Sequence, residues 1–307
     1  MCTPIGMCEP PGTIAAMPDA SSVVPGCVPT GPEICGDGID QDCDGSDPAC
    51  PSNDTASGAI DVTMGGTFTV DLSAAHADAD PGSDASCGTT GGRDVFYKVH
   101  ITTPESYYLD TFDSSFDTVV RVYHGQCQGS GTPDSAECQD DQCTTTQTQG
   151  VWDLGFGTSC IVVAQKSNAE TSGALTLHVE RGNRSGQPID LGTPVTGDTS
   201  TGKNQSTPVV GGVCVDGMTP DADYHFTVCP NVTGNVTATA CNATTAFASE
   251  TYIVGPAGQL ACGACGDSGM PSTAAVSDVT GPHMYWIIVD GTAAGADGGY
   301  ELDTTIQ

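Results

Sequence analysis

The segment Asp94-Val-Phe-Tyr-Lys-Val99 decides the fold, because the chain repeats its pattern at Asp223-Tyr-His-Phe-Thr-Val228. Both segments are short and rich in β-branched and aromatic residues, as strands are. The segments that follow them also correspond in order: 116–123 with 247–254, 160–164 with 285–291, and 174–179 with 300–304. The sequence therefore predicts an internal duplication.

The first copy spans residues 55–181, and the second spans 182–307. Gly- and Pro-rich turns separate short alternating strings of apolar residues in the first copy, which favours strands over helices. Its expected strands are 59–62, 67–72, 94–101, 106–111, 118–123, 160–165 and 174–179. About seven short strands in such a length are typical of a sandwich. We therefore expect an all-β protein with two tandem antiparallel β-sandwich domains.

The charge balance narrows the class of partner. The chain has 307 residues with 38 acidic and 7 basic side chains, a formal net charge of −31. Such a field repels nucleic acid and anionic membrane surfaces and attracts divalent cations. No apolar stretch is long enough to span a membrane, so no direct insertion is expected.

Sixteen cysteines indicate an oxidising compartment. Zinc would need repeated C-x2-C pairs, and Cys262 with Cys265 form the only one. Disulfides in an extracellular or cell-surface protein fit better. Since no signal peptide follows Met1, we expect a mature or partial chain whose export signal lies outside it.

The duplication suggests a set of disulfide pairs, although sequence cannot fix connectivity. The expected bonds are Cys127–Cys138, Cys262–Cys265, Cys143–Cys160 and Cys229–Cys241. Cys87 and Cys214 then remain, one in each copy. They could bridge the sandwiches, pair with the amino-terminal segment or link two protomers.

Residues 1–54 form a Pro- and Cys-rich arm that cannot bury a core of its own, so we expect an irregular segment stapled by disulfides and calcium. Within it, Asp40, Asp42, Asp44 and Gly45 spell D-x-D-x-D-G, a spacing that supplies oxygen ligands to Ca2+. Pro51 stands where an EF-hand has its glutamate. A solvated acidic linker is the alternative. The predicted Ca2+ ligands are Asp37, Asp40, Asp42, Asp44 and Asp47.

A second metal site is conceivable in the first sandwich, where carboxylates cluster in sequence or on paired turns. A solvated acidic rim is the alternative. The candidate ligands are Asp110, Asp113, Asp117, Asp140 and Asp141.

A serine-protease interpretation starts from two short stretches. Leu72-Ser-Ala-Ala-His76 is similar to the histidine motif of trypsin-like enzymes, and Cys265-Gly-Asp-Ser268-Gly-Met270 is similar to their nucleophile loop. Met270 replaces a motif glycine, and the two stretches fall in non-equivalent loops of the two copies. We therefore expect no enzyme activity.

The stretch from Glu33 to Cys50 resembles a short metal-binding motif of secreted and surface proteins in myxobacteria and related bacteria. It is also similar to the Asp-rich calcium repeats of thrombospondins. This resemblance covers about 18 residues and implies an extracellular protein.

Both copies resemble the bacterial pre-peptidase C-terminal (PPC) domain. Gly92-Arg-Asp-Val-Phe-Tyr97, Ser115–Tyr123 and Cys160-Ile-Val-Val163 carry the likeness in the first copy; Asp223–Phe226 and Tyr285–Gly291 carry it in the second. The resemblance implies a non-catalytic secreted β-sandwich module that sometimes binds calcium. The second copy has Ala248 in place of Asp117, which puts a calcium site there in doubt.

Three functions follow as hypotheses. The first is a non-catalytic, calcium-stabilised structural or adhesive protein, for instance the head-to-tail subunit of a surface filament, with partners among its own copies, other surface proteins or glycans. The second is the carboxy-terminal substrate-binding region of a larger secreted hydrolase, and the third is a metal scavenger. Decoration as a glycoprotein stays open at N-x-S/T triplets beginning at Asn53, Asn183, Asn204, Asn231, Asn235 and Asn242.

Overall fold

The computed structural model describes residues 26–79, 91–127, 136–168, 172–205, 219–265 and 272–307. The chain forms two compact units, Met1–Cys50 and Pro51–Gln307. Among the described residues, the regular elements of the second unit are strands and short 3-10 turns, which confirms the predicted all-β class. Cys87, Cys214 and Ser268 lie outside the described residues.

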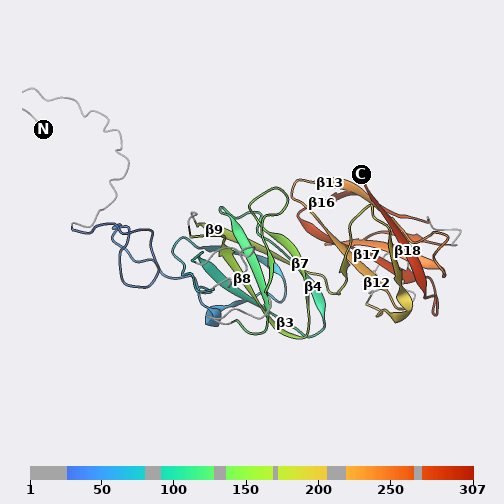
Figure 1. Ribbon diagram of the computed structural model, residues 1–307, viewed down its shortest axis with the longest axis horizontal. Coiled ribbons are helices and arrows are strands. Elements are labelled where there is room, and N and C mark those ends of the chain that lie inside the picture. Colours follow the sequence, from blue (N-terminus) through green and yellow to red (C-terminus); the bar gives the residue numbers. More distant parts are fainter. Residues whose placement is uncertain (1–25, 80–90, 128–135, 169–171, 206–218, 266–271) are drawn as a thin grey trace, which may run out of the picture. The chain divides into compact units, whose positions relative to one another are not determined.

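The first sandwich consists of two sheets (Figure 1). The five-stranded sheet has the order β1-β3-β8-β5-β6, with bounds Ile60–Asp61, Asp94–Ile101, Gly157–Gln165, Thr118–His124 and Ala136–Gln139. The four-stranded sheet has the order β2-β9-β4-β7, with bounds Gly66–Asp71, Ala174–Arg181, Glu105–Asp110 and Gln149–Leu154. A 3-10 turn, η1 (Ala56–Gly58), precedes β1.

The second sandwich, drawn from yellow to red in Figure 1, has the same plan. Its five-stranded sheet has the order β10-β12-β17-β14-β15, with bounds Gln187–Pro188, Ala222–Val228, His283–Gly291, Ser249–Gly255 and Gly258–Ala264. Its four-stranded sheet has the order β11-β18-β13-β16, with bounds Val195–Asp198, Gly299–Ile306, Thr233–Thr239 and Ala274–Thr280. The 3-10 turn η3 (Thr199–Thr201) follows β11.

The matching strand orders confirm the duplication. β3 corresponds to β12, β5 to β14, β8 to β17 and β9 to β18, as the sequence correspondence predicts. Both five-stranded sheets also share a feature absent from the prediction: their short edge strands, β1 and β10, run parallel to their neighbours. The strands β6 and β7 were missed in the sequence because β6 reads Ala-Glu-Cys-Gln and β7 contains a glycine.

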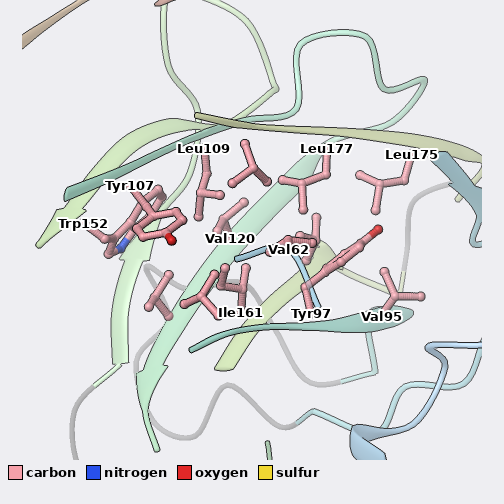
Figure 2. Close-up of a cluster of buried hydrophobic side chains, with 14 of the residues drawn as sticks. Val62, Val95, Tyr97, Tyr107, Leu109, Val120, Trp152, Ile161, Leu175 and Leu177 are labelled. Atoms are coloured by element: carbon pink, nitrogen blue, oxygen red, sulfur yellow. The ribbon is translucent and has the colours of Figure 1, made fainter. Parts of the chain in front are cut away.

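The core of the first sandwich lies between its two sheets. Figure 2 shows Trp152 and Tyr107 at one end of this cluster, with Leu109, Val120 and Leu177 beyond them. All five are buried, because alternate side chains of each strand point into the space between the sheets. The second core combines the buried alanines Ala238, Ala240 and Ala274 with aromatic side chains such as Phe226 and Tyr285.

The two sandwiches also pack on each other. Tyr108 of β4 joins Tyr252, Met284, Trp286 and Ile288 of the second sandwich in one buried cluster. The side-chain amide of Gln149 donates to the Tyr108 hydroxyl at 3.0 Å and to the Val228 carbonyl at 3.1 Å. A disulfide between Cys143 and Cys229 adds a covalent tie across this contact.

The four expected disulfide pairs are wrong. The structure instead has Cys127–Cys160, Cys143–Cys229 and Cys241–Cys265 in the sandwiches, and Cys27–Cys43 and Cys35–Cys50 in the amino-terminal unit. Cys138 and Cys262 are also disulfide-bonded. All eight cysteines of the four expected pairs are therefore disulfide-bonded, with different partners.

Strand register explains two of these corrections. Cys127 comes just after the end of β5. Cys138 lies opposite Arg121, well before that end, whereas Cys160 on the neighbouring strand β8 lies opposite Tyr123, close to it. Cys262 and Cys265 are at and just beyond the end of β15, and two extended residues three apart have Cα atoms roughly 10 Å from each other. That separation exceeds the reach of a disulfide.

The sheet topology explains why the other two expected pairs, Cys229–Cys241 and Cys143–Cys160, do not form. Cys229 follows β12 and Cys241 follows β13, but these strands belong to different sheets of the second sandwich. Cys143 lies between β6 and β7 and is bonded across the contact between the sandwiches, so it is not available to Cys160.

Candidate metal and binding sites

The acidic loop of the amino-terminal unit is organised by its own carboxylates. Asp47 accepts hydrogen bonds from the backbone N–H groups of Gly36 and Gly38, both at 2.7 Å. Asp37 accepts from the N–H of Ile39 at 2.8 Å and from the side-chain amide of Gln41 at 2.7 Å. These two predicted ligands therefore hold the turn in shape.

Asp40 and Asp42 lie close to Glu33, which is not among the Ca2+ ligands predicted from the sequence. Single carboxylate oxygens of Glu33, Asp40 and Asp42 all lie within 4.8 Å of one another. Glu33 also accepts a hydrogen bond from the Asp42 N–H at 2.7 Å. The cluster offers three of the 6–8 oxygen ligands that Ca2+ takes.

The D-x-D-x-D-G spacing produces this arrangement through the backbone. Asp40 accepts from the N–H groups of Asp44 and Gly45, at 3.0 and 2.9 Å, and Gly45 has a φ of 98°, which favours glycine. Asp44 accepts from the N–H and hydroxyl of Ser46, both at 2.8 Å. Each carboxylate oxygen has two lone pairs, so these bonds leave acceptor capacity for a cation.

Two disulfides fix the ends of the loop. Cys35–Cys50 and Cys27–Cys43 close it, and the buried residues among 26–50 are Cys35, Gln41 and Cys43. Sulfur cross-links and hydrogen bonds to carboxylates therefore supply the order that an apolar core supplies elsewhere.

The second candidate metal site divides into two groups. Asp117, Asp140 and Asp141 each place one oxygen within 4.8 Å of the others. The ammonium of Lys166 lies among them, 2.7 Å from Asp140 and 3.3 Å from Asp141. The hydrogen bonds that the Lys166 ammonium donates, first that to Asp140, raise its pKa.

The remaining two carboxylates of that candidate site pair with a histidine. The Nδ1 atom of His178 lies 2.9 Å from Asp110, and its Nε2 atom lies 3.6 Å from Asp113. The structure thus brings together three of the five predicted ligands and supplies them with an internal cation.

One carboxyl group is buried in the first sandwich. Asp94 is fully buried, and its Oδ2 accepts from the Ala79 N–H at 3.0 Å, while its Oδ1 has no hydrogen-bond partner in the described residues. Burial raises the pKa of Asp94 to about 7. Arg121, also buried, lowers that pKa but does not offset the loss of water.

The histidine of the protease interpretation does have a carboxylate beside it. Its Nδ1 atom lies 2.6 Å from Asp54, which is buried. Ser268, the proposed nucleophile, lies outside the described residues. His76 and Ser268 remain in different copies of the duplication, as the sequence already indicates.

Comparison with known proteins does not assign this chain to a family. A scan against protein-family models finds no match, and a search of curated proteins finds none either. Among solved structures, matches include the CUB1-EGF-CUB2 domains of rat MASP-1, at 11% identity over 80% of this chain and 99% of that one, with a TM-score of 0.21. The CUB1-EGF-CUB2 domain of human MASP-1/3 matches at 12% identity over 78% of this chain and 99% of that one, with the same TM-score of 0.21. Likenesses at this TM-score carry no argument about function.

A search for membrane spans gives a negative result for the described residues: none of their helices is long and apolar enough to cross a bilayer.

Proposed function

We propose that this chain is a non-catalytic, calcium-stabilised structural or adhesive protein of the cell exterior. The observation that carries the proposal is the amino-terminal acidic loop, where Glu33, Asp40 and Asp42 converge between two disulfides. Disulfides persist in oxidising surroundings, and those surroundings are rich in free Ca2+.

Calcium is favoured over other metals by the chemistry of the donors. Three hard carboxylate oxygens, with a backbone that turns sharply beneath them, suit Ca2+. With a formal charge of −31 on the chain, a divalent cation would also relieve repulsion among carboxylates. Asp117, Asp140 and Asp141 are a weaker candidate because Lys166 already neutralises part of their charge.

The resemblance of both copies to PPC domains supports an accessory role without catalysis. Head-to-tail self-association into a filament is part of the proposal, with the Pro- and Cys-rich arm as the connecting element. Its test is electron microscopy of the intact protein with and without Ca2+. Filaments are expected with Ca2+, and dispersed monomers under both conditions would contradict them.

Calcium binding is tested by isothermal titration of the chelator-stripped protein. One or two tightly bound ions are expected for a structural role. Many ions at sub-micromolar affinity would instead indicate a scavenger, and absence of heat would remove calcium from the proposal. Labelling of Ser268 by a fluorophosphonate probe would contradict the non-catalytic assignment.

A second candidate, the substrate-binding region of a larger secreted hydrolase, is favoured by a polar cleft in the second unit, described below. The flanking gene sequence discriminates between the two, because the second candidate requires a catalytic domain upstream.

A further inference from the structure

A cleft of about 720 Å³ opens between the two sandwiches. One wall is the end of β7 and the turn that follows it, represented by Asp153 and Gly155. The other wall is formed by β11, by the segment after η3 and by the start of β12, represented by Thr196, Lys203 and Asp223. Its volume is that of a typical small-ligand site.

The floor of the cleft is a hydrogen-bonded network. Asp223, which is buried, accepts from the Arg184 guanidinium at 2.9 Å and from the side-chain amide of Gln205 at 3.1 Å. The backbone N–H of Gln205 donates to Asp221 at 2.8 Å, and the hydroxyls of Tyr224 and Tyr300 lie 2.5 Å apart. Such a network fixes the shape of the site before a ligand arrives.

The two walls are held at a fixed spacing. The Cys143–Cys229 disulfide and the buried cluster around Trp286 join the sandwiches. Arg184 also lies over the Trp286 ring, 5.8 Å from its centre, and so connects the floor to that cluster. The cleft therefore borders the buried contact between the sandwiches.

An exposed aromatic residue comes directly after the cleft wall in the sequence. Phe156 follows Gly155 of the wall directly and is 76% exposed. Gly157, with a φ of 111°, completes the tight turn that presents it. A single exposed phenylalanine is ordinary on a protein surface. Here its neighbour in the sequence, Gly155, lines a cleft with hydroxyl, amide and carboxylate groups.

We infer that this cleft binds a neutral oligosaccharide, with the C–H face of one sugar ring on Phe156 and the hydroxyls of the next rings on the polar walls. A sugar combines these two surfaces, an apolar face and a rim of hydroxyl donors and acceptors. The exposed side chains of Gln187, Thr196 and Thr201 offer matching groups. This inference deepens the adhesive part of the proposed function and rests on it.

The negative charge of the cleft and of the whole chain favours neutral sugars over acidic ones. Among the described residues that line the cleft, Lys203 is the single cation, while Asp153 and Asp198 are exposed carboxylates. The whole chain adds a net charge of −31. A uronic acid chain would therefore be repelled.

The test is isothermal titration of the intact protein, with Ca2+ in excess, against cellotetraose, maltotetraose, chitotetraose and tetragalacturonate. We expect at least one neutral tetrasaccharide to bind with one-to-one stoichiometry, and tetragalacturonate to bind at least tenfold more weakly. Phe156→Ala should weaken binding about tenfold or more. Met64→Ala is the matched control, since Met64 is 79% exposed on another turn of the same sandwich.

Thr196→Arg is a second variant, designed to fill the cleft from an exposed position on β11. It should abolish binding without changing the melting temperature. The inference is overturned if no neutral tetrasaccharide binds, if Phe156→Ala and Thr196→Arg bind like the parent, or if tetragalacturonate binds as tightly.

The experiment distinguishes failure of the sugar inference from failure of the proposed function. If binding is absent while Ca2+ still raises the melting temperature, only the sugar inference is lost. If chromatography shows that a tetrasaccharide is cleaved during incubation, the non-catalytic assignment itself is contradicted.

Discussion

The acidic loop and the first sandwich obtain their order from different forces. In the loop, carboxylates accept hydrogen bonds from backbone N–H groups, and two disulfides close the ends. In the sandwich, side chains such as Trp152, Leu109 and Val120 are buried between two sheets. The loop should therefore respond to chelators and reductants, and the sandwich to changes in its core.

The largest effect should come from the sandwich core. Trp152→Ala is expected to cost about 3–5 kcal/mol of unfolding free energy, because it removes a fully buried indole and leaves a cavity. Calorimetry measures the loss, and titration of the same variant should give an unchanged Ca2+ affinity. A fall in Ca2+ affinity would mean that the two regions do not depend on separate forces.

The loop should lose order when one of its two disulfides, Cys35–Cys50, is removed. Changing both Cys35 and Cys50 to Ser opens a bond with a sequence separation of 15, which should cost the loop about 3 kcal/mol. Ca2+ binding should then weaken while the melting of the sandwiches stays the same. The control changes Cys241 and Cys265 to Ser, and it should leave Ca2+ binding intact. Unchanged Ca2+ binding after loss of Cys35–Cys50 would contradict this.

Asp94 gives the sandwich a pH response. Its pKa in the folded protein is about 7, above the ordinary 3.8, so between these values the folded carboxyl keeps a proton that the unfolded chain has lost. Stability from this group is therefore fully present below pH 3.8, is lost as the pH rises from there to about 7, and stays lost at higher pH.

Asp94→Asn should remove that loss. At pH 8 the variant should be more stable than the parent by roughly 1–3 kcal/mol, because it removes a buried, poorly bonded charge. The difference should shrink by pH 5, as followed by denaturant titration. Asp61→Asn, at an exposed site, is the control and should show no such trend. A difference that does not vary with pH would refute the assignment.

The smallest effect concerns Lys166, the internal cation of the sandwich. Lys166→Met leaves Asp117, Asp140 and Asp141 without their ammonium partner. In chelator the melting temperature should fall by about 2–4 °C, corresponding to about 1 kcal/mol or less for this partly exposed group. Added Ca2+ should restore the melting temperature. No recovery, measured by scanning fluorimetry, would show that these carboxylates do not bind the ion.

The sequence was sufficient for the class of fold and the duplication, because strand patterns such as Asp94–Ile101 are local and occur twice. It was insufficient for the disulfides, because pairing depends on register: a shift along β5 decides whether Cys127 meets Cys138 or Cys160. Cysteines that are near in sequence, such as Cys262 and Cys265, are separated by the extended backbone.

The candidate sites show the same difference between local features, which the sequence predicts, and features that depend on the arrangement of the strands. The D-x-D-x-D-G spacing was enough to identify Asp40 and Asp42, since their convergence is set within a few residues. Glu33 was missed as a contributor, although it opens the motif that the loop resembles. Lys166 could not be anticipated beside Asp140 either, because only the sheet brings the ends of β6 and β8 together.

The central claim is that Ca2+ orders the acidic loop while the sandwiches hold by their cores. Hydrogen–deuterium exchange of the intact, oxidised protein, with Ca2+ and then with excess chelator, tests it most directly. Amides of Gly36, Gly38, Asp44 and Gly45, which donate to loop carboxylates, should exchange much faster in chelator, while amides of β3 and β8 should not change. Equal exchange of the loop amides under both conditions would contradict the claim.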